Sequence, residues 1–314
     1  MKNGYGSRLC LILLGLLLAL GCRANGPDSP QPVGQATSLP EPAWVSLDYE
    51  AKASVGEVST SLVLADASAG ELSAPPYQAL KDAPPPMSAA HLRVLRVQGR
   101  AKALLGGYRS EGSIWFDAGT GAVLQRDKLR PGRKPYRKVY RFRPDGAFRV
   151  KLEPANRAEA EGSSERWTKI RESYYPYDDA GSGCKVVSEP TLLLYLLPRL
   201  DLAAGAKTVD ECVFWDDAVY RVRLEPQGRE VRDLDYRERA GGGEQRVSGS
   251  REVLKVALGV EPVTPGAERS DFEFLELRGD IVIYLDVASR IPVLLSGERS
   301  GFGRLDIPLV RMSR

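Results

Sequence analysis

Histidine is almost absent from this chain. Its 314 residues include 1 histidine, His91, at the edge of a Pro-rich stretch where we expect a surface position. A zinc site with two histidines is therefore excluded, and a histidine-based catalytic triad would depend on this one residue. The sequence also lacks a G-x-S-x-G elbow, a phosphate-binding G-x-x-x-x-G-K loop and a Rossmann fingerprint. We therefore expect no enzyme, no cofactor and no metal site.

An excess of one charge is also missing. The chain has 44 lysines and arginines against 41 aspartates and glutamates, a formal net charge of +3. Such a balance gives no reason to expect a nucleic-acid partner. After the N-terminal region no apolar run is long enough to cross a membrane, since even the leucine-rich stretch 192–197 is far too short.

The N-terminus has the pattern of an export signal. Lys2 and Arg8 precede a short apolar run, 9–20, which ends in Ala-Leu-Gly-Cys at 19–22. This end resembles the bacterial lipobox, although leucine is commoner where Ala19 stands. The resemblance implies cleavage before Cys22 and acylation of its thiol, which would anchor the protein to a membrane. The alternative is an ordinary cleaved signal in which Cys22 occurs by chance.

The rest of the chain divides by composition. Residues 1–21 are the expected signal peptide, and 22–42, rich in Pro, Gly, Ser and Gln, form a flexible tether. Residues 43–314 are expected to form one β domain, with a Pro/Ala-rich surface loop near 67–90. In lipoproteins with this signal, an aspartate after the cysteine favours the inner membrane, so Arg23 favours the outer membrane, facing the periplasm.

Cysteine is scarce, and its use fits an oxidising compartment. Of 4 cysteines, Cys10 would leave with the signal and Cys22 would be acylated. An even pair, Cys184 and Cys212, remains, and such a pair in an exported chain usually forms a disulfide. The alternative is a redox pair, but the spacing is not C-x-x-C.

Alternating apolar residues predict strands through most of the domain. The stretch 136–153 predicts a hairpin with Asp145-Gly146 as its two-residue turn. One main helix is expected at 189–200, where Pro190 suits a first helical position and several leucines share a face. Many strands with one helix indicate a mainly β fold, an antiparallel sheet forming a sandwich or an open (unclosed) barrel.

The order of these features resembles the exported family called domain of unknown function 3108. The resemblance is carried by the strands at 47–64, the turn at Asp117, Pro131, the helix and glycine turn at 189–209, and the strand–turn–strand at 280–303. It implies a mostly antiparallel β protein of the cell envelope and assigns no catalytic residue. The turn at 286–292 is also similar to one in the periplasmic lipoprotein-carrier fold, an unclosed barrel with an apolar concavity.

The most informative polar stretch is 126–143, which is dense in basic residues. On a strand, Tyr136, Lys138, Tyr140 and Phe142 would face one side and the arginines the other. One interpretation of this arrangement is contact with phosphates of an anionic lipid or another envelope polyanion. The alternative is a solvated strand whose charges discourage edge pairing. The candidate anion-binding patch comprises Arg130, Arg133, Lys134, Arg137, Arg141 and Arg143.

Acidic and aromatic clusters are expected to be structural. Carboxylates at 178–179, 210–211, 216–217 and 271–276 are typical of solvated turns, although a glycosidase would need two of them across a cleft. The tyrosines at 174–177 are expected to pack the edge of the β core rather than to bind sugars.

These patterns predict a non-enzymatic envelope lipoprotein. We expect its β domain to bind an envelope component or a partner protein, with a lipid held in a concave sheet as one form of this hypothesis. One alternative is a structural or assembly accessory without a ligand. Another is a carboxylate-based hydrolase of envelope polysaccharide.

Overall fold

The structure is a computed structural model that describes residues 41–73, 87–103, 106–177, 183–184, 186–200, 202 and 208–314. The chain divides into two compact units, Met1–Thr37 and Ser38–Arg314, and every described residue belongs to the second. The predicted signal peptide, Cys22 and the tether up to residue 40 therefore lie outside the described residues. Of the predicted loop near 67–90, the first part contains a 3-10 turn, η1 (Ala69–Ser73), and 74–86 also lie outside them.

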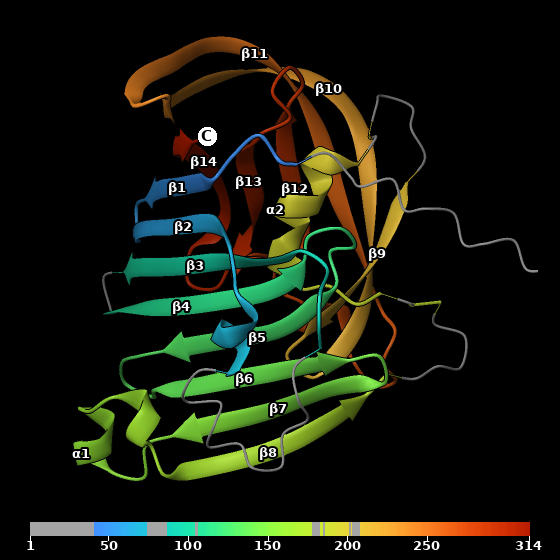
Figure 1. The fold of residues 1–314 in the computed structure, drawn as a ribbon. Coiled ribbons are helices and arrows are strands. Elements are labelled where there is room, and N and C mark those ends of the chain that lie inside the picture. Colours follow the sequence, from blue (N-terminus) through green and yellow to red (C-terminus); the bar gives the residue numbers. More distant parts are fainter. Residues whose placement is uncertain are drawn as a thin grey trace, which may run out of the picture. The chain divides into compact units, whose positions relative to one another are not determined.

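Fourteen strands form one sheet, which confirms the predicted mainly β class (Figure 1). The N-terminal eight are β1 (Ser46–Ala53), β2 (Gly56–Asp66), β3 (Leu92–Ala103), β4 (Gly106–Asp117), β5 (Val123–Arg130), β6 (Tyr136–Arg143), β7 (Gly146–Glu153) and β8 (Lys169–Pro176). The others are β9 (Val209–Trp215), β10 (Ala218–Ala240), β11 (Gly243–Pro262), β12 (Arg278–Asp286), β13 (Pro292–Arg299) and β14 (Gly303–Ser313).

The sheet is open and its neighbours along the strand order are antiparallel. The order runs from β8 back to β1, continues through β14 and back to β9, and leaves β8 and β9 at its two ends. The long strand β10 also pairs in parallel with β14, between Arg237 and Arg311 among others. Two curved halves, β1–β8 and β9–β14, therefore meet at the β1–β14 pair (Figure 1).

Alternation of side chains explains the two faces of this sheet. In β2, Val58, Thr60, Leu62 and Leu64 are buried, while the residues that alternate with them are less covered. Period-2 alternation sends the apolar side chains of a strand to one face, where their burial stabilises the fold. We call the face that packs on the central helix the inner face of the sheet.

The predicted helix is present as a short, fully buried segment. It consists of η4 (Pro190–Leu192), α2 (Leu193–Leu196) and η5 (Leu197–Arg199). Its leucines are buried on every side rather than on one face, because both halves of the sheet pack around it. No helix in the described part of the chain is long and apolar enough to cross a membrane. The remaining helical turns are α1 (Arg157–Ala160), η3 (Ser164–Arg166) and η6 (Arg269–Asp271).

The β6–β7 hairpin differs from its prediction by one position. Arg143 pairs with Gly146, so the two turn residues are Pro144 and Asp145 rather than Asp145 and Gly146. Proline favours this position because its ring fixes φ near the value that the first turn residue needs. Gly146 instead allows β8 to approach, since a Cβ there would lie 2.5 Å from the carbonyl oxygen of Tyr175.

Candidate functional site: a cationic inner face

Strand register brings four cations into one row on the inner face. Lys128 lies opposite Lys138, Lys138 opposite Lys151, and Lys151 opposite Arg171, across β5, β6, β7 and β8. Neighbouring strands are about 4.8 Å apart, so the row extends over about 14 Å. Like charges directly opposite each other destabilise a sheet. Such a row therefore needs carboxylates or a bound anion to compensate it.

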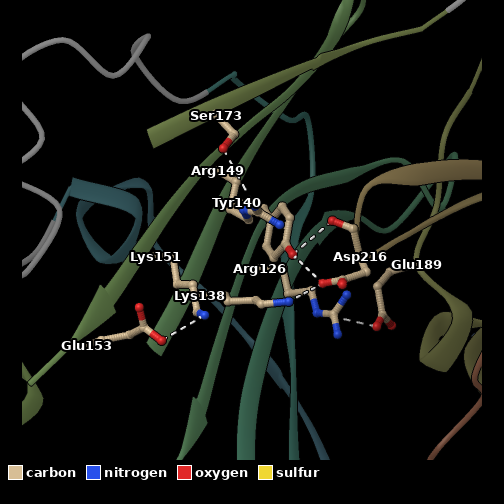
Figure 2. A network of polar contacts seen from close by, with 9 residues as sticks. All are labelled: Arg126, Lys138, Tyr140, Arg149, Lys151, Glu153, Ser173, Glu189 and Asp216. Carbon is tan, nitrogen blue, oxygen red and sulfur yellow. Dashed lines mark hydrogen bonds and ion pairs between the residues drawn. The ribbon is translucent and has the colours of Figure 1, made fainter. Parts of the chain in front are cut away.

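A second row lies beside the first. Arg126 is opposite Tyr140, Tyr140 opposite Arg149, and Arg149 opposite Ser173, to whose hydroxyl its Nη2 donates at 3.3 Å. Figure 2 shows these side chains converging on one region of the inner face. We call the two rows of basic side chains the cationic face; its members are Arg126, Lys128, Lys138, Arg149, Lys151 and Arg171.

One carboxylate reaches the cationic face from the β9–β10 turn. Asp216 has a positive φ of 52° and accepts hydrogen bonds from Lys138 Nζ and, at 3.1 Å, from the Tyr140 hydroxyl (Figure 2). Burial opposes ionisation of Asp216, but Lys138 and Tyr140 outweigh it and hold the pKa of this carboxyl below its usual value. Asp216 therefore neutralises the middle of the first row.

Two glutamates compensate the ends of the cationic face. Glu189, buried at the start of the central helix, lies 3.6 Å from Arg126 Nε. Glu153 accepts from Lys151 at 2.8 Å and also from Arg171. Six basic side chains thus share three carboxylates, so the face keeps a positive potential.

Several donors of the cationic face have no acceptor. Arg126 Nη1 and Arg149 Nε are covered from solvent and make no hydrogen bond. Among the described residues, Lys128 forms no ion pair; its Nζ lies 4.9 Å from the centroid of the Trp215 ring. Burial, with a contribution from nearby Arg126, lowers the pKa of Lys128 to about 8. Buried donors without partners are uncommon in folded proteins and indicate a missing acceptor.

Two hollows open onto the cationic face. The Ser173 hollow holds about 480 Å³ and is lined by Lys138, Arg149, Lys151, Arg171, Glu172 and Ser173. The Trp215 hollow, between Arg126, Lys128, Glu189 and Trp215, holds only about 60 Å³. The first is large enough for a small polyanion, whereas the second holds about two water molecules.

The structure separates the predicted basic patch. Arg141 is buried and donates to Gln125, and Arg137 is half-buried and holds Asp127 through Nε and Nη2. These two arginines lie on the outer face, opposite to Lys138, and are engaged within the protein. The exposed members, Arg130, Arg133 and Lys134, cluster at the β5–β6 connection, and Arg143 lies at the far end of β6. The predicted six residues therefore form no single surface.

Two acidic residues expected in solvated turns face inward instead. Asp216 accepts from Lys138 of the cationic face, and Glu276 lines the Trp215 hollow. Both have a positive φ, of 52° and 68°. No sequence pattern marks this geometry, because neither residue is a glycine or an asparagine. In the described stretches of the chain, no group of three or more His, Cys, Asp or Glu side chains could hold a metal ion.

Aromatic residues behave mainly as predicted. Tyr175 and Tyr177 pack at 6.0 and 6.3 Å from Phe214, at the edge of the main core, and Tyr174 stays largely exposed. Phe214 also meets Tyr140, which links this cluster to the cationic face. These aromatic contacts therefore hold β6 and β8, which carry part of the basic rows, against Phe214 of β9.

Cys184 and Cys212 form a disulfide with a Cα–Cα distance of 5.7 Å, in agreement with the predicted pair. Cys212 lies on β9, and the backbone of Ser188 continues the contact through hydrogen bonds with Cys212 and Phe214. The disulfide thereby fastens the chain just before Glu189, the partner of Arg126.

Comparison with known proteins gives no match. No family model, no curated protein and no solved structure matches this chain. The resemblance to the domain of unknown function 3108 remains a prediction.

Proposed function

We propose that this chain is a lipid-anchored protein of the cell envelope, and that its cationic face binds phosphate groups of an envelope component. The observation that carries the proposal is the row Lys128, Lys138, Lys151 and Arg171, four like charges on directly opposed positions. A protein that only needed a stable sheet would gain by alternating the signs of these charges. Sites that bind ligands commonly sacrifice stability in this way.

The chemistry of the donors favours phosphate. Guanidinium groups offer planar pairs of N–H donors that match phosphate oxygens, and lysine adds mobile point charges. Arg149 and Arg171 flank the Ser173 hydroxyl, a further donor, in a hollow of about 480 Å³. The anion would accept the one hydrogen bond that Arg149 Nε can donate and does not make within the protein.

An apolar ligand is less well supported than an anion. The leucines of α2 fill the space between the two halves of the sheet, and the adjoining Trp215 hollow has only about 60 Å³. Pockets for drug-sized ligands usually hold about 300–1,000 Å³. We therefore prefer recognition of a charged group to storage of an acyl chain.

The hydrolase alternative has one suggestive feature. Glu189 and Glu276 line the same hollow; Glu189 is paired with Arg126, while burial raises the pKa of Glu276 to about 7. Glycosidases also hold one carboxyl ionised and the other protonated. The volume of about 60 Å³ excludes a sugar ring from this hollow, so phosphate binding is the better proposal.

The lipid anchor predicts a simple outcome for the Cys22→Ala variant. Without its thiol the chain has no acylation site, so we expect the protein to leave the membrane fraction or to remain unprocessed. Fractionation and intact-mass measurement distinguish these outcomes. Cys10→Ala, which changes a cysteine inside the predicted signal, is the matched control and should leave anchoring unchanged. An acylated Cys22→Ala protein would disprove the anchor.

Phosphate binding by the soluble Cys22→Ala form should weaken at alkaline pH. Because the pKa of Lys128 is about 8, its charge falls between about pH 7 and about pH 9, and we expect pyrophosphate affinity to fall about threefold through this group. Calorimetry of Lys128→Met should show a flatter dependence of affinity on pH, because titration of pyrophosphate itself affects both proteins equally.

Vesicles of phosphatidylcholine with and without phosphatidylglycerol test whether lipid headgroups supply the phosphate. Binding to neither pyrophosphate nor phosphatidylglycerol would refute the function.

A further inference from the structure

A third hollow adjoins the cationic face at its β5 end. This Arg299 hollow holds about 280 Å³ and lies against Tyr108, Ser110, Lys128, Arg130, Glu276 and Arg299. Lys128 belongs both to this hollow and to the first basic row. Glu273 and Arg278 also line this hollow and pair with each other, so the basic side chains continue past β5.

Arg299 is the most enclosed basic group of this hollow. Its side chain is only 3% exposed, and its Nη2 donates to the Tyr108 hydroxyl and to Glu276 Oε2. Its Nη1 is covered from solvent and has no hydrogen-bond partner. A buried guanidinium nitrogen on the wall of a polar hollow indicates that an acceptor belongs there.

Arg130 adds a second guanidinium beside the same aromatic ring. Its Cζ lies 5.3 Å from the centroid of the Tyr108 ring, and that of Arg299 lies 5.5 Å away. Among the described residues Arg130 makes no ion pair with a carboxylate, and it is exposed enough to move toward a ligand. Two guanidinium groups held by one tyrosine form a site suited to an oxyanion.

Glu276 provides only partial compensation. Leu275 and Glu276 occupy a two-residue turn with positive φ at both positions, 49° and 68°, closed by reciprocal hydrogen bonds between Phe274 and Leu277. Such a turn strains residues other than glycine and asparagine, and strain of this kind is often retained at functional sites. Burial raises the pKa of the Glu276 carboxyl to about 7, although Arg299 opposes the rise. The hollow therefore stays positive near neutral pH.

We propose that the Arg299 hollow is a second phosphate-binding subsite, so that the ligand carries at least two phosphate groups, one held by Arg130 and Arg299 and one by the Ser173 hollow. This inference rests on the proposed function. The row that joins the two subsites spans about 14 Å, so the ligand is extended rather than compact. A bisphosphorylated lipid headgroup and a soluble phosphate chain share this chemistry.

Titration of the Cys22→Ala form with pyrophosphate should detect two binding events per chain. Arg130→Gln should weaken one event about fivefold and leave the other within about twofold, because one exposed charge contact is lost. Arg133→Gln is the matched control: it removes an exposed arginine from the same connection, but Arg133 does not line the hollow. Glu276→Gln should have the opposite effect, because it should strengthen the binding event that Arg130→Gln weakens.

Long-chain polyphosphate should bind more tightly than pyrophosphate, because it reaches both subsites at once. Competition of polyphosphate with phosphatidylglycerol vesicles identifies the source of phosphate: displacement means that lipid headgroups use the same subsites. A single pyrophosphate binding event whose affinity is unchanged by Arg130→Gln and by Glu276→Gln would overturn the second subsite. It would not contradict the proposed function. Absence of binding to both pyrophosphate and the phosphatidylglycerol vesicles would instead overturn the proposed function.

Discussion

Replacing Lys151 and Arg171 together by glutamine should lower pyrophosphate affinity about 30-fold. Both side chains line the Ser173 hollow, on adjacent strands and directly opposite each other. A hydrogen bond to a charged group contributes about 1.5–3 kcal/mol, which partial exposure reduces to about 1 kcal/mol for each side chain. The summed loss of about 2 kcal/mol corresponds to about 30-fold in the dissociation constant. Calorimetry on the soluble form measures it.

The same double variant should have nearly the same free energy of unfolding as the parent. Removing two cations relieves repulsion within the row, while Glu153 loses Lys151 and Arg171 and keeps Lys169 of β8 at 3.9 Å. With Arg171 57% exposed, these opposing effects are small, and we expect a change within about 0.5 kcal/mol in urea unfolding. A loss of affinity without a loss of stability therefore indicates a binding surface.

The β10–β11 hairpin offers a control with the same change of charge. Arg237 pairs with Glu244 and Arg246 with Asp235, both exposed and outside the three hollows. Arg237→Gln combined with Arg246→Gln should leave pyrophosphate affinity within about twofold once salt screens long-range attraction. An equal loss in both double variants would show that net charge alone governs binding.

Removing the disulfide should lower the free energy of unfolding by about 3–4 kcal/mol. Cys184 and Cys212 are 28 positions apart, and closing a loop of this size restricts the unfolded chain by about that amount in the chain-entropy model. The loop encloses the central helical segment, whose burial depends on both halves of the sheet. Urea unfolding of Cys184→Ala combined with Cys212→Ala measures the difference.

Reducing agent provides the control for this prediction. It should destabilise the parent and leave the double alanine variant unchanged, because only the parent has a bond to break. A difference below about 1 kcal/mol would mean that residual structure in the unfolded chain already restricts this segment without the disulfide.

Local sequence determined the class of the fold. Alternating apolar residues in stretches such as 57–64 specify strands whatever they pair with, because period 2 is a property of the strand itself. The leucines at 192–197 and Pro190 specified a helix, and two remaining cysteines specified a disulfide. What local pattern did not determine was that the helix would be enclosed on every side, since that depends on the curvature of a 14-stranded sheet.

The cationic face was decided by register, which is a tertiary property. A turn at Asp145-Gly146 would have placed Lys138 opposite Glu153, an ordinary ion pair. The actual turn at Pro144 and Asp145 shifts the pairing by two residues, so Lys138 lies opposite Lys151. Sequence identified the basic residues of 126–143, but the predicted patch included Arg137 and Arg141, which lie on the outer face, and left out Arg126, Lys128 and Lys138. Only the pairing of β5 to β8, together with the inward turns of Asp216 and Glu276, showed where unpaired positive charge accumulates.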